Sequence, residues 1–345
     1  MNRRQMLLLM GNRLNLPYSI DFSGLSDGPL PPKFLGPTWS IVSGKAVNTP
    51  TLNGELLADP GLEATYTDGK CDTLLKGGTP TLSESSEVHG GSKAQDFTAG
   101  ANNDSLKWAG QAGIASVWYQ VSGWVKRLAG TASQVFLAVY TGGAGTAFPS
   151  NITRLPIKSA TYTQKKLNFI PLTTGLNYVY PTWQIGATGN DNVLVDDISL
   201  QRISNETLFS LLPSSQPDVV IKVRPDTLVD STCFGMVLRA EKQFNPNNYV
   251  IGICRLDNTE ANVNFMIIKC VSGLYTIVLA ETAKAIVADA WFELRGSGSS
   301  ISVWYNNLQV GTTQTISDAE ILSNRHHGVI SGGSNKFKNF FLSTN

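Results

Sequence analysis

Two neighbouring stretches decide the fold: Thr38–Val47 (TWSIVSGKAV) and Asn53–Glu63 (NGELLADPGLE). The first predicts two short strands joined by a turn at Ser43-Gly44, because glycine tolerates the positive φ of a tight turn. The second begins a different pattern, which closes only at Val195–Leu200 (VDDISL). The chain is therefore expected to start one β-sandwich, leave it to build a second, and return to finish the first.

The composition suits an all-β protein. The 345 residues are 42% hydrophobic and can bury two cores, while 32 glycines and only 15% charged residues suit turn-rich sandwiches better than helices. We expect two β-sandwich (jelly-roll) domains, one inserted in the other, plus an N-terminal arm. The predicted boundaries are residues 1–20 for the arm, 21–52 and 204–345 for the discontinuous outer sandwich, and 53–203 for the insert.

Charge and hydropathy exclude two classes of partner. A net charge of +1 and an isoelectric point near 7.6 provide no basic stripe for phosphate contacts. No stretch approaches the roughly 20 apolar residues that span a bilayer. Neither nucleic acid nor membrane insertion is expected.

The N-terminus carries a short apolar run after Arg3-Arg4. The run ends at Gly11-Asn12-Arg13. It is shorter than the apolar region of about 7–15 residues that a secretion signal needs. One interpretation is a floppy tail. The other, which we favour, is an assembly arm that docks on a neighbouring subunit through Met6, Leu7, Leu8, Leu9 and Met10.

The cysteines bear on the redox compartment. In the hairpin predicted for residues 249–254 and 265–270, Cys254 faces a position near Phe265 and Cys270 faces one near Tyr249. The sulfurs are then too far apart to bridge, and no Cys-x-x-Cys spacing indicates a metal site. The expected state is four reduced, mostly buried thiols, which fits assembly in a cytoplasm: Cys71, Cys233, Cys254 and Cys270.

In the C-terminal half, short strands rich in β-branched and aromatic residues recur at the spacing of a sandwich. Asn306-Asn307 predicts a tight hairpin turn with positive φ. Several stretches resemble, in chain order, the laminin-G type of the concanavalin A-like lectin/glucanase superfamily. The resemblance implies that the first strand lies beside the last and that the curved sheet can hold a glycan. The stretches are Asp21-Phe22-Ser23, Thr38–Ile41, Gly235–Arg239, Asn248–Gly252, Val303–Leu308, Arg325–Gly328 and Phe337–Phe341.

Four stretches of the insert carry a second resemblance: Asn53–Glu63, His89–Ala94, Trp118–Lys126 and Val195–Leu200. They resemble carbohydrate-binding modules of the galactose-binding-like jelly-roll type, the xylan- and glucan-binding families among them. Two departures are Leu62, where phenylalanine is usual, and the stretch 161–165, which lacks the usual tryptophan.

This second resemblance implies a structural calcium that joins the first and last strands of the insert. Its ligands carry over to the side chains of Glu63 and Asp197 and to backbone carbonyls of the Gly91-Ser92-Lys93 turn, and oxygen-only ligation suits Ca2+. The alternative is that Glu63 and Asp197 cap turns or accept hydrogen bonds from backbone amides.

Candidate glycan contacts follow from strand alternation in the insert. Sugars present apolar faces and hydroxyl edges, so aromatic faces with polar neighbours suit them. Tyr119, Val121 and Val125 share the expected core face. The alternative for Trp124 and Trp183 is that they belong to the sandwich core. The candidates are Trp118, Gln120, Ser122, Trp124 and Lys126 on the opposite face, with Trp183 and Gln184 from a later strand.

Catalysis is not expected. Hydrolases of the concanavalin A-like type resemble one another in a Glu-x-Asp-x-Glu strand that places two carboxylates about 5 Å apart, and this spacing does not occur in the sequence. His326-His327 is expected to be an exposed pair at a strand entry and not a general base.

These observations suggest the biological context in which the protein works. Two lectin-like sandwiches, no export signal and an N-terminal arm fit a bacteriophage virion protein, released by lysis, that decorates the capsid or extends the tail. Its expected partners are other virion proteins, further copies of itself and a surface polysaccharide. The alternatives are a free-standing bacterial carbohydrate-binding protein and, more distantly, a polysaccharide depolymerase.

Overall fold

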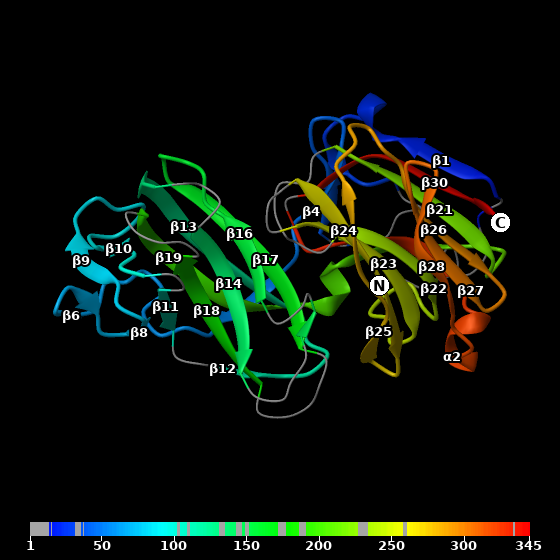
Figure 1. Cartoon of the computed structure of the whole chain (residues 1–345). Helices are drawn as coiled ribbons and strands as arrows, with labels where there is room; N and C mark the ends of the chain where they lie inside the picture. Colours follow the sequence, from blue (N-terminus) through cyan, green and yellow to red (C-terminus); the bar gives the residue numbers. More distant parts are fainter. Residues whose placement is uncertain are drawn as a thin grey trace, which may run out of the picture.

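A computed structural model shows two β-sandwiches side by side (Figure 1). It describes residues 14, 16–31, 36, 38–101, 104–108, 111–130, 135–142, 147–148, 152–171, 177–185, 191–226, 234–257, 261–333 and 335–345. For 111–113, 135–142, 147–148, 152–156 and 177–185, it describes the backbone alone. The predicted all-β class, with one sandwich inserted in the other, is confirmed. The predicted arm Met6–Met10 lies outside the described residues.

The outer sandwich consists of two antiparallel sheets. The larger contains, in pairing order, β2 (Gly28–Pro29), β3 (Trp39–Ile41), β4 (Ala46–Asn48), β30 (Lys336–Thr344), β21 (Val219–Pro225), β26 (Phe292–Ser297), β27 (Ser300–Tyr305) and β28 (Leu308–Thr315), with β1 (Tyr18–Asp21) also on β30. The smaller contains β20 (Phe209–Pro213), β29 (His326–Ser331), β22 (Phe234–Ala240), β23 (Tyr249–Leu256), β24 (Asn262–Val271) and β25 (Leu274–Ala285).

The insert also consists mainly of two sheets. One contains β15 (Ala147–Phe148), β17 (Thr163–Pro171), β13 (Tyr119–Ala129), β19 (Asn192–Ile203), β10 (Ala94–Thr98) and β9 (Thr81–Ser85), with β5 (Leu52–Glu55) also on β19. The other contains β16 (Ile152–Pro156), β14 (Val135–Gly142), β18 (Asn177–Ile185), β11 (Ser105–Trp108) and β8 (Leu74–Gly77), with β12 (Gln111–Gly113) on β18. A separate pair is formed by β6 (Tyr66–Thr67) and β7 (Lys70–Cys71).

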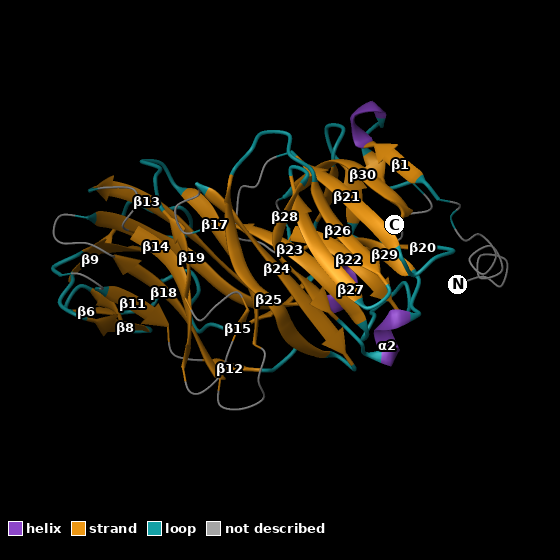
Figure 2. Ribbon diagram, turned by 45° about the vertical axis from the view of Figure 1, so that its right-hand side comes forward, coloured by secondary structure: helices purple, strands orange, loops and turns teal. Residues whose placement is uncertain are grey.

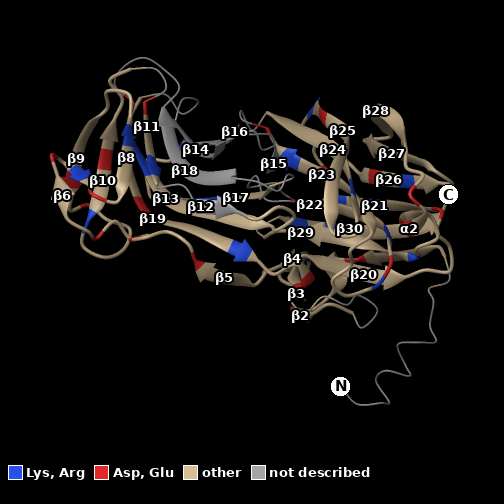
Figure 3. Cartoon of the chain, turned by 90° about the horizontal axis from the view of Figure 1, so that it is seen from below, with Lys and Arg blue, Asp and Glu red and all other residues tan. Residues whose placement is uncertain are grey.

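Helices are short and few in the described part (Figure 2), and none of them is long and apolar enough to cross a membrane. They are η1 (Phe22–Gly24), η2 (Asn205–Thr207) and α2 (Ala319–Leu322). Acidic and basic residues are interspersed along both sandwiches (Figure 3).

Several local predictions agree with the structure. Asn306 and Asn307 have φ values of 49° and 64° in the β27–β28 turn, as the Asn-Asn dipeptide predicts. Strand β1 pairs with β30, so the first strand lies beside the last. In the β23–β24 pair, Cys254 lies opposite Phe265 and Cys270 opposite Tyr249. Cys71, Cys254 and Cys270 are buried thiols outside any disulfide, whereas Cys233 lies outside the described residues.

The two segments that connect the sandwiches hydrogen-bond to each other. The Thr51 amide donates to Thr207 Oγ1 (3.0 Å), and the Ser204 amide donates to the Thr51 carbonyl (3.0 Å). Asn48, which is buried, donates from Nδ2 to the Thr207 carbonyl (2.8 Å). The chain therefore leaves and re-enters the outer sandwich at one point, as loop insertion of a domain requires.

A third apolar cluster joins the sandwiches, besides the core of each. It contains Trp118, Ile170 and Ile203 of the insert together with Tyr275 and Ile268 on the smaller outer sheet. Trp118 has no exposed surface. Because burial of apolar area is the main stabilising term in folding, we expect the junction to behave as a core and not as a flexible link.

Candidate functional site

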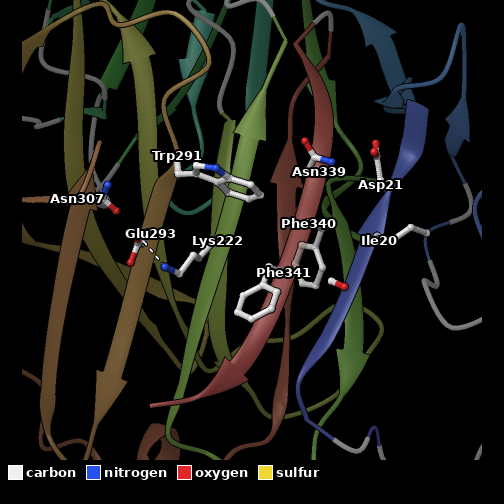
Figure 4. Close-up of a pocket in the computed structure, with 10 residues that line it drawn as sticks. Ile20, Asp21, Lys222, Trp291, Glu293, Asn307, Asn339, Phe340 and Phe341 are labelled. Carbon is white, nitrogen blue, oxygen red and sulfur yellow. Dashed lines mark hydrogen bonds and ion pairs between the residues drawn. The ribbon is translucent and has the colours of Figure 1, made fainter. Parts of the chain in front are cut away.

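A groove of about 580 Å³ lies on the larger sheet of the outer sandwich. Its walls come from β1, β30, β21, β26 and the β27–β28 turn, so it crosses strands from both ends of the chain. Figure 4 shows Trp291 and Phe341 on the same side of the sheet, with Lys222 lying between the strands that carry them.

Strand register explains which side chains share the groove. Ser19 lies opposite Phe341, Phe341 opposite Lys222, Lys222 opposite Glu293, and Glu293 opposite Trp304. Because neighbouring residues on a strand point to opposite faces, the adjacent row faces inward. That inward row belongs to the core and contains Phe340, Val223, Phe292 and Tyr305.

The polar floor of the groove is a chain of ion pairs. Glu293 has no exposed surface and accepts from Lys222 Nζ at 3.0 Å and from Arg295 Nη2 at 2.6 Å. The Arg295 guanidinium in turn covers one face of Trp304, with its Cζ 3.9 Å from the ring centroid. A buried carboxylate needs such partners, because an unpaired buried charge is very costly.

The next row carries Asp21, Asn339 and Arg224, which are register neighbours. Hydrogen bonds from Ser23, chiefly from its backbone amide, hold the pKa of exposed Asp21 below its usual value. The Arg224 guanidinium lies over Trp291, 5.8 Å from the ring centroid. Among the described residues, Asn339 Oδ1 and Arg224 Nε are buried without a hydrogen-bond partner.

The groove therefore combines two half-exposed aromatic side chains with carboxylate, amide and ammonium groups. This combination can stack on the apolar face of a sugar ring and hydrogen-bond to its hydroxyls. These residues are not among the glycan contacts predicted from the sequence, although the alternation of lysine and aromatic residues in 336–341 is a signal for strand β30 with two different faces.

The structure contradicts two predicted glycan contacts in the insert. Trp118 is completely buried, and its Nε1 donates to the Tyr275 hydroxyl at 3.2 Å across the junction. Gln120 is also buried, and its Nε2 donates to Asn168 Oδ1 and to the Gly332 carbonyl, both at 3.1 Å. The predictions for both residues are wrong, because the face of β13 opposite the core is covered at this end by the outer sandwich.

Further along β13, two other candidates are partly accessible. Trp124 is half-buried, and His89 stacks on it with ring centroids 3.6 Å apart and an interplanar angle of 13°. Lys126 is paired with Glu87, whose carbonyl accepts from the Tyr162 hydroxyl at 2.9 Å. One face of Trp124 is thus already occupied, so a sugar would have only the other.

The remaining candidates divide between sheets. Trp183 and Gln184 lie on β18, in the sheet opposite that of β13, and their side chains lie outside the described part. Ser122 lies on β13 and is buried. A single glycan site made of all these residues is therefore not formed on one sheet face.

The two predicted calcium-binding carboxylates, Glu63 and Asp197, both lie beside the Gly90-Gly91 turn. Asp197 Oδ2 would lie 2.7 Å from a side chain added at Gly90, and a side chain at Gly91 would collide with Glu63 Oε1. Glu63 accepts from the Ser92 hydroxyl (2.6 Å) and from the amides of Ser92 (2.8 Å) and Lys93 (3.2 Å). These amide hydrogen bonds are those of the alternative interpretation, and Asp197 Oδ2 lies 2.7 Å from His89 Nδ1. Calcium binding stays a prediction.

The expectation for the histidine pair is wrong in part. His326 is half-buried, but His327 is fully buried: its Nδ1 accepts from the Arg239 amide (3.1 Å), and its Nε2 lies 2.9 Å from the Gln216 carbonyl. Burial lowers the pKa of His327 to about 3. It is a structural residue on β29, which lies between β20 and β22 in the smaller sheet.

No protein-family model matches the chain, and no curated protein sequence matches it. The N-terminal CBM22-1–CBM22-2 tandem domain of Paenibacillus barcinonensis Xyn10C aligns with a TM-score of 0.35 and 8% identity, over 86% of this chain and 98% of its own.

Two further solved structures align with parts of the chain. The carbohydrate-binding module CBM66 from Bacillus subtilis has a TM-score of 0.30 and 15% identity, over 39% of this chain and 81% of its own. An arabinose-bound α-L-arabinofuranosidase has a TM-score of 0.35 and 13% identity. The alignment covers 44% of this chain but only 27% of that enzyme. At these TM-scores, the alignments support no conclusion about function.

Proposed function

We propose that the chain is a non-enzymatic glycan-binding protein and that the groove on the larger outer sheet receives the sugar. The observation that carries the proposal is the placement of Trp291 and Phe341 on one face of the sheet, flanked by Asp21, Asn339 and Lys222. Aromatic faces with adjacent hydrogen-bonding groups are what a carbohydrate needs from a protein surface.

The carboxylates of the groove are poorly suited to glycoside hydrolysis. A glycosidase needs one carboxyl group with a raised pKa to protonate the leaving group. The pKa of Asp21 is lowered, and both oxygens of Glu293 are held by cations. Binding without cleavage is therefore the chemistry that these residues support best.

The biological setting in this proposal is a bacteriophage particle, with other virion proteins and further copies of the chain as partners and a surface polysaccharide as ligand. It rests on the sequence alone. A free-standing bacterial carbohydrate-binding protein fits the groove equally well. Mass spectrometry and labelled imaging of purified particles distinguish the two, because only a virion protein co-purifies with particles in a fixed ratio.

The test of glycan binding is a screen of the full chain on a glycan array, followed by calorimetry with the best ligand. Trp291→Ala and Phe341→Ala should each weaken binding at least tenfold, about 1.4 kcal/mol. Phe244→Ala is the matched control, because Phe244 is an exposed aromatic residue outside the groove. A silent array, or an effect of Phe244→Ala equal to that of Trp291→Ala, would refute the proposal.

A further inference from the structure

We infer that the groove binds an internal stretch of a neutral, extended polysaccharide laid across the strands, an inference that rests on the proposed function. Three features carry it: the length of the groove across the sheet, the separation of its two aromatic residues, and the pairing of its one lining cation with a carboxylate.

The groove is long in the direction perpendicular to the strands. Its lining runs from Ser19 and Asp21 on β1, across β30, β21 and β26, to Asn307 in the β27–β28 turn. Four interstrand spacings of about 4.8 Å give roughly 19 Å. A single sugar ring would occupy only a fraction of this length, so a chain of several residues fits it better.

The two aromatic residues are too far apart to serve one ring. Phe341 lies on β30 and Trp291 directly precedes β26, with β21 between these strands. Two interstrand spacings separate their strands by roughly 10 Å, and Trp291 also lies two residues along the strand from Glu293, which is in the same row as Phe341. Each stacks on a different residue of the ligand, so the ligand chain runs obliquely across the sheet and Lys222 faces the segment in between.

The charges of the groove favour a neutral ligand. Lys222 is the only cation among the described residues that line the groove, and Glu293 engages it. Arg224 and Arg295 are not lining residues, and their guanidinium groups lie over Trp291 and Trp304. Asp21 is exposed at the other end of the groove, beside Asn339. A uronic acid there would meet a like charge, and like charges at short range repel.

The test is a chain-length series on the unmodified full-length protein. Xylo- and cello-oligosaccharides of one to six residues and galacturonate oligomers of the same lengths serve as calorimetric probes. Affinity for a neutral series should rise at least tenfold from one residue to four, and the galacturonates should bind more weakly at every length. A monosaccharide that binds as tightly as its hexasaccharide, or a tighter galacturonate, overturns the inference.

Variants then locate the two contacts. In Phe341→Ala, affinity should reach its plateau at a shorter chain length, because one of the two stacking positions is lost, whereas Phe244→Ala should leave the plateau unchanged. Equal plateaus in Phe341→Ala and the parent would contradict the crossing direction. If neither neutral series binds but another glycan on the array does, the inference fails and the proposed function stands; a silent array refutes both.

Discussion

Trp118 of the insert and Tyr275 of the outer sandwich meet edge to face, with ring centroids 6.1 Å apart and planes at 89°. The indole Nε1 donates to the Tyr275 hydroxyl, which is also hydrogen-bonded to the Tyr249 hydroxyl. A large buried side chain thus joins the two sandwiches through a pair of residues that are 157 positions apart in the sequence.

Removing this contact should destabilise the whole chain. Trp118→Ala leaves a cavity in a closed apolar cluster, so we expect the free energy of unfolding to fall by about 3–5 kcal/mol. Trp304→Ala, which removes a half-exposed tryptophan stacked on Arg295, should cost about 1 kcal/mol or less. Chemical denaturation of both variants measures the difference. Equal losses would show that the junction is not a core.

Acid should destabilise the protein through His327. Its pKa is lowered to about 3 in the folded state from an ordinary value of 6.5, so the unfolded chain binds the proton first as the pH falls. The stability contribution is complete above pH 6.5 and is lost as the pH falls toward 3, at up to about 1.4 kcal/mol per pH unit.

Melting temperatures between pH 7 and pH 5 check this expectation, since few carboxylates titrate in that window. His327→Gln should flatten the pH dependence, while His326→Gln, at the neighbouring half-buried position, should preserve most of it. A parent protein with a flat profile over this range would contradict the prediction.

Calcium should stabilise the insert if Glu63 and Asp197 bind it. An ion that binds the folded state raises stability in proportion to the logarithm of its concentration. We expect a chelator to lower the melting temperature and Asp197→Ala to abolish that difference. Asp72→Asn, in an acidic residue that accepts from Thr67 Oγ1 and lies outside the predicted ligand set, is the control. Identical melting curves with calcium and with chelator would contradict calcium binding. The hydrogen bonds that Glu63 accepts would then be its only interactions at this turn.

Deletion of Met1–Arg13 tests the predicted arm. The deletion should end before Leu14, because Leu14 is buried and its amide donates to the Pro213 carbonyl at 3.0 Å. We expect both sandwiches to stay folded, as circular dichroism would show, while incorporation into particles or oligomers is lost. Unchanged assembly of the shortened chain would contradict the role of Met6–Met10.

Local sequence signals predicted much of the fold. Asn306-Asn307 specifies its turn through the backbone angles that asparagine tolerates, and the pairing of Cys254 with Phe265 follows from counting outward from a loop. These signals need only neighbouring residues, and for that reason they succeeded.

The candidate site depends on relations that such signals do not contain. Alternation shows that Trp118 faces away from the core of the insert, but not that Tyr275 covers that face. Likewise, Ser19, Lys222 and Phe341 become neighbours only through the register of three strands that are far apart in the sequence. The buried position of His327 has the same origin, since its partners Arg239 and Gln216 lie 88 and 111 residues away.

The apolar junction also has a mechanical consequence. It covers the smaller outer sheet, whereas the groove lies on the larger sheet, so the two occupy opposite sides of the outer sandwich. A pull on a polysaccharide held by Trp291 and Phe341 would pass through both sheets and through Trp118 into the insert. The two sandwiches would then move as one rigid body and transmit force from a bound glycan to the end of the insert that is far from the groove.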